Sequence, residues 1–85
     1  MENENTMKYN PELDRKLQIE SVLKEVYNSL VEKGYDPTSQ IVGYLLSGDP
    51  TYITSYNNAR GVISRVERDE IIEFFVKSFL KNIEE

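Results

Sequence analysis

The chain contains few side chains that could carry out a reaction. None of its 85 residues is a cysteine or a histidine, so it lacks a thiolate nucleophile, the commonest metal ligand and the commonest general base. One pattern, Ser21-Val-Leu-Lys24, matches the Ser-x-x-Lys motif of serine acyl-enzymes. It has no companion motif and lies within a helical pattern, so we interpret it as helix surface. We therefore predict a protein that is not an enzyme, with no catalytic residue, no metal site and no cofactor.

Two other groups of residues suggest chemistry but have simpler interpretations. Glu67, Asp69, Glu70 and Glu73 lie close together in the sequence. An acidic first turn of a helix, which the helix dipole favours, explains them without acid–base catalysis. Residues 47–50 (Ser-Gly-Asp-Pro) lack the Gly-Lys-Ser/Thr ending of a phosphate-binding loop, so they predict a corner between helices.

Three arginines and two tyrosines are the best candidates for binding a partner or a phosphate. Arg60, Arg65 and Arg68 form the only arginine cluster and could present an anion-binding face. Pairing with the acidic residues at positions 67–73 explains them equally well. Of the six tyrosines, only Tyr9 and Tyr56 are predicted to be available to a partner, because the others accompany apolar helical positions or corners.

Thr6 is the candidate for regulation by phosphorylation. It lies in residues 1–12, where Met7 is the single aliphatic apolar residue after Met1 and Tyr9 is the single aromatic one. Such a segment buries too little apolar surface to offset the entropy lost on ordering. We therefore predict a flexible tail over residues 1–12 and a helical domain over residues 13–85. A protein kinase needs an accessible segment of this kind, although an isolated tail threonine is more often inert.

Helical periodicity accounts for the first half of the domain. Apolar residues recur every three or four positions over residues 14–33, and Gly34 predicts the end of that helix. Asp36-Pro37 and Asp49-Pro50 each place a capping aspartate before a proline, so they bracket a second, short helix. The predicted buried stripe of this helix consists of Ile41, Val42, Leu45 and Leu46.

The second half predicts a turn and two further helices. Residues 51–55 form the turn, with Tyr52 and Ile53 pointing inward. Residues 59–66 form a helix that Gly61 weakens by up to about 1 kcal/mol, and residues 69–82 form the last one. The break between these two falls within residues 64–69. The predicted fold class is all-α, a compact bundle of about four to five short helices.

The last predicted helix has a wide apolar face. At about 100° per residue, its apolar side chains cover about half of the circumference, more than the roughly 100° that one small core requires. A homodimer is the simplest way to cover the excess, with Ile71, Phe74, Phe75 and Phe79 as interface candidates. The alternative is that the core of the single chain covers the whole face.

Composition limits the location and the partners. The net charge is −5, which repels a nucleic-acid backbone unless the basic residues gather on one face. A DNA-binding regulator of the helix-turn-helix type is the alternative, because residues 36–65 contain short helices at a sharp corner. No apolar run approaches the roughly 20 residues of a membrane span, and the N-terminus lacks the features of a signal peptide. We therefore expect a cytoplasmic protein that neither inserts into a membrane nor binds nucleic acid.

Several runs of residues together resemble one known family. They comprise Thr6-Met7-x-Tyr9-Asn10, Lys33-Gly34-Tyr35, Asp36-Pro37, Gln40–Pro50, Tyr52-Ile53, Ala59-Arg60 and Glu67–Glu73. The chain resembles the IreB regulatory phosphoproteins of Gram-positive bacteria, a family that includes the ReoM proteins. It departs from the family pattern at Ser55 and Ser64, where relatives often carry basic residues, at Thr54, where proline is frequent, and at Gly61.

The resemblance implies a function as well as a fold. It implies a small all-helical homodimer with a disordered N-terminus, phosphorylated on a tail threonine by a membrane-anchored Ser/Thr kinase with extracellular PASTA repeats and dephosphorylated by the matching phosphatase. Thr6 falls on the acceptor position. Similar proteins govern peptidoglycan synthesis and cell-wall antibiotic tolerance by controlling Clp-protease turnover of the enzyme that commits UDP-N-acetylglucosamine to the wall.

The resemblance leaves the switching mechanism open. Phosphorylation of Thr6 would add a charge of about −1.5 to −2. The phosphate could fold back onto Arg60, Arg65 or Arg68 and cover an adaptor surface, or it could repel an acidic partner. The partners that the resemblance implies are a second copy of the chain, the kinase and its phosphatase, and the Clp machinery or its adaptor.

Overall fold

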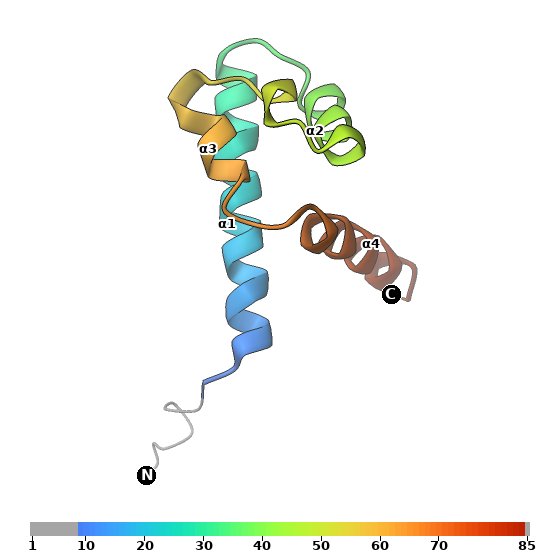
Figure 1. Cartoon of the computed structure of the whole chain (residues 1–85). Helices are drawn as coiled ribbons and strands as arrows, with labels where there is room; N and C mark the ends of the chain where they lie inside the picture. Colours follow the sequence, from blue (N-terminus) through green and yellow to red (C-terminus); the bar gives the residue numbers. More distant parts are fainter. Residues whose placement is uncertain (1–8, 85) are drawn as a thin grey trace.

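One long helix carries the residues against which the other helices pack. The computed structural model describes residues 9–84, and α1 (Pro11–Glu32) is the longest element, with its start next to the N-terminal segment (Figure 1). The Asn10 side chain accepts hydrogen bonds from the backbone N–H groups of Glu12 and Leu13, and Pro11 occupies the first turn. The helix therefore begins at Pro11, and the predicted end of the tail at residue 12 was two residues too late.

The predicted stops and caps of the first two helices are confirmed. Gly34 has a φ of +85°, and the next N–H, of Tyr35, donates to the Leu30 carbonyl, which closes α1. The Asp36 carboxylate caps α2 (Pro37–Ser47) by accepting from the Thr38 N–H. Gly48, with a φ of +75°, ends that helix, as a left-handed residue without a Cβ can.

The buried face of α2 differs from the prediction. Tyr44 is its only fully buried residue, while Ile41 and Leu45 are partly buried and pack against the core. Val42 and Leu46 are exposed, so their predicted burial was wrong. Periodicity could not identify Tyr44, because apolar residues occupy several neighbouring sides of this helix. Which of these sides is buried depends on where the other helices lie.

A sharp corner follows α2. Asp49 caps the 3-10 turn η2 (Pro50–Tyr52), and the following Ile53 is fully buried, as predicted. Tyr52 is half exposed rather than inward, because its ring lies over Gly43, where an added Cβ would be 2.6 Å from the ring. A second 3-10 turn, η3 (Tyr56–Asn58), leads into the short helix α3 (Ala59–Ile63), which ends three residues earlier than predicted.

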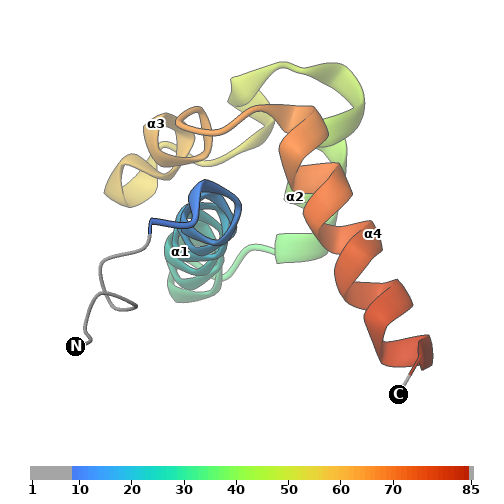
Figure 2. The same cartoon turned by 90° about the horizontal axis from the view of Figure 1, so that it is seen from below.

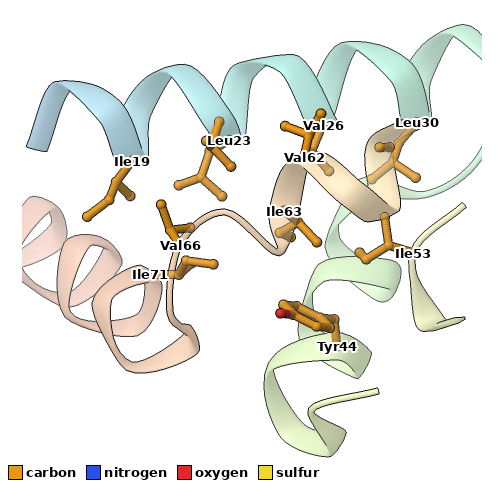
Figure 3. Packing of buried hydrophobic residues seen from close by; sticks show 12 residues of the cluster. Ile19, Leu23, Val26, Leu30, Tyr44, Ile53, Val62, Ile63, Val66 and Ile71 are labelled. Carbon is orange, nitrogen blue, oxygen red and sulfur yellow. The ribbon is translucent and has the colours of Figure 1, made fainter. Parts of the chain in front are cut away.

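The core lies between α1 and α3. Val26 and Leu30 of α1, Val62 and Ile63 of α3, and Ile53 are essentially inaccessible to solvent and point toward one another (Figure 3). Side chains that reach this cluster come from every α-helix, since Tyr44 lies at its α2 side and Ile71 at its α4 side. The predicted all-α fold is confirmed: residues 9–84 form four α-helices and two 3-10 turns, with no strand.

The last helix is attached to the body mainly at its start. In α4 (Arg68–Glu84), Ile71 is fully buried and Phe74 packs against the core. Arg15 of α1 forms a two-pronged ion pair with Glu70, with 2.8 Å between Arg15 Nε and Glu70 Oε2. Seen along α1, the C-terminal part of α4 projects away from the other helices (Figure 2). This attachment leaves much of the α4 surface exposed.

Candidate regulatory site and interaction surfaces

The regulatory candidate Thr6 lies outside the described residues. The nearest described residue is Tyr9, which is 73% exposed and donates a hydrogen bond of 3.4 Å from its hydroxyl to Asp14 Oδ2. Tyr9 is thus accessible, as predicted, and lies beside the start of α1. Residues before Tyr9 are therefore connected to the helical domain through Asn10, the N-cap of α1.

Two of the three candidate arginines bind backbone carbonyls. Arg60 Nε donates to the carbonyl oxygens of Ile53, at 2.9 Å, and Pro50, at 3.1 Å. Arg68 Nη1 donates to the Leu45 carbonyl at 2.9 Å. These bonds stabilise the corners on either side of η2, because a guanidinium offers several donors in a fixed geometry. No sequence pattern predicts this role, because it depends on the positions of carbonyl groups far along the chain.

Of the two interpretations of these arginines, pairing with the nearby acidic residues is contradicted within the described part of the chain. There, Glu70 pairs with Arg15 and Glu73 pairs with Lys77 at 3.0 Å. The pKa of Glu70 is lowered to about 2, first by its hydrogen bond with Arg15 and then by the backbone N–H of Glu67. Arg65 is exposed, and among residues 9–84 it has no ion-pair partner. Of the cluster, Arg65 alone makes no such contact among residues 9–84, which makes it the strongest of the three candidates for binding a partner.

Tyr56 is already engaged by its own chain. Lys33 Nζ lies over its ring, 5.0 Å from the centroid, a distance suited to a cation–π contact. A hydrogen bond with the Glu32 carboxylate raises the pKa of the Tyr56 phenol. The ring is half-buried, so Tyr56 ties the end of α1 to η3 and offers a partner less surface than predicted.

A groove between the start of α1 and α4 was not predicted. It encloses about 510 Å³, within the roughly 300–1,000 Å³ typical of ligand pockets. Leu13, Ile19 and Phe74 supply its apolar lining. The polar residues around it are Asn10, Glu12, Arg15, Lys16, Glu70, Glu73, Lys77, Ser78 and Lys81. Sequence patterns could not reveal the groove because its two walls come from opposite ends of the chain.

The exposed face of α4 includes two of the four predicted interface residues. Phe79 is 64% exposed and Phe75 is 41% exposed. Ile71 was wrong as an interface candidate, since it is fully buried within the chain, and Phe74 is partly buried against the core. Four other exposed apolar residues share the helix with Phe75 and Phe79: Ile72, Val76, Leu80 and Ile83. We call these six residues the α4 apolar face.

Three other kinds of site can be checked among residues 9–84: a metal site, a membrane-spanning helix and a DNA-binding helix. Residues 9–84 contain no group of three acidic side chains arranged to hold a metal ion. None of their helices is both long enough and apolar enough to cross a membrane. The helix-turn-helix alternative lacks a basic recognition helix, because α2 has no lysine or arginine and α3 has only five residues.

Comparison with known families identifies the chain. A family model described as IreB regulatory phosphoprotein matches residues 4–81. The match begins before Thr6 and extends into the last turns of α4, so it spans both the regulatory candidate and the helical body. It confirms the family that the sequence motifs suggest. The chain therefore belongs to the IreB family of regulatory phosphoproteins.

Proposed function

We propose that this protein is a non-enzymatic adaptor whose choice of partner is switched by phosphorylation of Thr6. The family match carries the proposal, because it includes Thr6 and names a regulatory phosphoprotein. The switch is local electrostatics: a phosphate adds a charge of about −1.5 to −2 and three strong acceptor oxygens to a neutral hydroxyl. A membrane-anchored Ser/Thr kinase with PASTA repeats adds the phosphate to Thr6, and the matching phosphatase removes it.

The output that we propose is control of peptidoglycan precursor synthesis. The adaptor would regulate Clp-dependent proteolysis of the first committed enzyme, and through it tolerance to cell-wall antibiotics. A protein of this composition fits an adaptor better than an enzyme, since it has neither cysteine nor histidine. Exposed Arg65 and the α4 apolar face are the surfaces that we expect a partner to contact.

We also propose that the working form is a homodimer joined through the α4 apolar face. Exposed apolar patches of more than a few hundred Å² usually mark interaction sites. Because the six residues of this face belong to one helix, two copies can pack α4 against α4 about a twofold axis. Each copy then buries the same surface, which is the commonest arrangement among homodimers.

In vitro phosphorylation tests the switch. Incubation of the full chain with the catalytic domain of a PASTA kinase should add one phosphate, which peptide mass spectrometry should locate at Thr6. A Thr6→Ala variant should remain unmodified under the same conditions. Phosphorylation of another residue, or no phosphorylation, would show that Thr6 is not the acceptor.

A second experiment tests the biological output. Cells that carry Thr6→Ala should differ from their parent in sensitivity to cell-wall antibiotics and in the half-life of the committing enzyme. Identical sensitivity and an identical half-life would contradict the proposed pathway, even with Thr6 confirmed as the acceptor.

A further inference from the structure

We propose that the groove between α1 and α4 receives the phosphorylated N-terminal segment, and that Lys16 and Lys81 bind the phosphate on Thr6. The occupant is residues 1–8 of the same chain. This inference rests on the proposed phosphorylation of Thr6 and specifies what the phosphate does once it is attached.

Chain connectivity brings Thr6 within reach of this groove. Asn10, the N-cap of α1, is itself one of the groove residues, so the preceding segment enters the molecule at the rim of the groove. Thr6 precedes Asn10 by four residues, and an extended chain spans at most about 3.6 Å per residue, or about 14 Å in total. Lys16 lies six residues beyond Asn10, which is about 9 Å along the helix.

The α4 wall is also close to this entry point. Glu12 in the first turn of α1 and Lys77 of α4 line the same groove. The pKa of Lys77 is raised mainly by its hydrogen bond with Glu73 and to a smaller extent by the charge of Glu12. Lys81 follows Lys77 by one helical turn and lines the same groove. A segment that turns back at Asn10 therefore meets lysines on both walls.

The short span between Thr6 and Asn10 also prevents a phosphate on Thr6 from binding Arg60 of the same chain. Arg60 donates to the Ile53 carbonyl, and Ile53 lies beside Leu30 near the far end of α1 (Figure 3). Leu30 is twenty residues beyond Asn10, or about 30 Å of helix. This exceeds the roughly 14 Å available between Thr6 and Asn10. A phosphate on Thr6 therefore cannot reach Arg60 of the same chain, whereas the groove lies within its reach.

The charges around the groove suit an anion. The whole chain has 10 basic and 15 acidic residues, yet four basic residues and only three acidic ones line the groove. Arg15 is held by Glu70, and Lys77 is in an exposed pair with Glu73. Lys16 and Lys81 have no ion-pair partner among residues 9–84. They are therefore the two cations best able to accept a phosphate.

The apolar part of the groove offers a place for Met7, the neighbour of Thr6. Leu13 is half exposed at the start of α1, and Phe74 on α4 is only partly buried. At 100° per residue, the groove residues of α4 occupy a different side of the helix from Phe75 and Phe79. Docking of the segment therefore leaves the α4 apolar face available for a second copy.

Paramagnetic NMR on the full chain tests the proposal without a kinase. Phosphothreonine is installed at position 6 by genetic encoding, and Glu2→Cys supplies a single spin-label site because the chain has no other cysteine. We expect the label to broaden the amide signals of Lys77, Ser78 and Lys81 at least several-fold more with the phosphate than without it. Lys16→Gln/Lys81→Gln should abolish that difference.

A matched double variant controls for loss of charge. Lys24→Gln/Lys33→Gln also removes two exposed cations, but neither lines the groove, so the broadening should persist. Broadening around α3, no broadening, or broadening that survives Lys16→Gln/Lys81→Gln would overturn the proposal. So would broadening seen only between a labelled copy and an isotope-enriched copy in a mixed sample, which would place the segment on the partner. A kinase that ignores Thr6 would instead overturn the proposed function and leave this result standing.

Discussion

Arg60 stabilises the corner before α3 by donating to two backbone carbonyls, of Pro50 and Ile53. Ile53 is fully buried, and a buried carbonyl without a donor is costly. Arg68 does the same for Leu45 at the end of α2. At the scale of single residues, Arg60 and Arg68 thus bind backbone carbonyls of their own chain, whereas exposed Arg65 does not.

Replacing Arg60 should therefore cost stability where replacing Arg65 does not. Arg60→Gln leaves the Ile53 carbonyl without its charged donor, and we expect unfolding free energy to fall by about 1–3 kcal/mol. Arg65→Gln should stay within about 0.5 kcal/mol of the parent, as for most surface changes. Urea denaturation measures both. Equal stability of the two variants would contradict the assigned role of Arg60.

The Arg15–Glu70 pair predicts a pH-dependent stability. Because the pKa of Glu70 is lowered to about 2 from an ordinary 4.5, the unfolded chain takes up this proton more readily than the folded one. The contribution of Glu70 is complete above pH 4.5 and is lost as the pH falls toward 2. Glu70→Gln should flatten stability against pH over this interval. Thermal melting at a series of pH values tests this, with Glu73→Gln in the exposed pair as control.

At the scale of elements, α2 is held between two aspartate caps and closed by a glycine. Gly48 has a φ of +75°, and an added Cβ would lie 2.8 Å from the guanidinium carbon of Arg68. The backbone conformation therefore requires glycine, and an added Cβ would also displace the Arg68 guanidinium. Gly61 differs, since it lies in α3 with an ordinary helical backbone and would meet only the end of the Asn58 side chain.

Alanine substitution at these two glycines should have opposite effects. Gly48→Ala forces an L-residue into the left-handed region, and we expect a loss of about 1–3 kcal/mol. Gly61→Ala should gain up to about 1 kcal/mol from helix propensity, because Asn58 can rotate away. Chemical denaturation of both variants measures the difference. A stabilised Gly48→Ala protein would show that α2 does not depend on this corner.

At the scale of the whole molecule, α4 is anchored at its start and exposed along the rest of its length. Ile71, Phe74 and the Arg15–Glu70 pair attach it, while the α4 apolar face points away from the core. The groove and this face occupy different sides of the same helix. One helix can therefore serve an intramolecular contact and an intermolecular one together.

A charge on the α4 apolar face should separate the two copies. Phe79→Glu would bury an unpaired carboxylate in the proposed interface, and we expect the dimer dissociation constant to rise at least about 100-fold, or about 2.8 kcal/mol. Tyr27→Glu, on an exposed part of α1, should leave association unchanged. Sedimentation equilibrium measures both constants. Unchanged association of Phe79→Glu would place the interface elsewhere.

Local rules of the sequence determined that the chain is helical and where several of the helices begin or end. The caps at Asp36 and Asp49 and the stop at Gly34 depend on neighbours within a few residues, so their prediction was confirmed. The burial of Ile53 was also predicted correctly, and the all-α class followed from helical periodicity. The family was also readable from sequence, because its motifs are contiguous runs.

Tertiary structure alone decided which apolar row faces the core and what the charged residues contact. On α2, Tyr44 is buried and Leu46 is exposed, and on α4, Ile71 is buried in the core and is not available to an interface. Both outcomes depend on the positions of distant helices. The carbonyl partners of Arg60 and Arg68 and the groove between α1 and α4 likewise join residues far apart in the chain. Periodicity gives each helix an apolar face, but only packing decides whether the chain covers that face itself or leaves it for a partner.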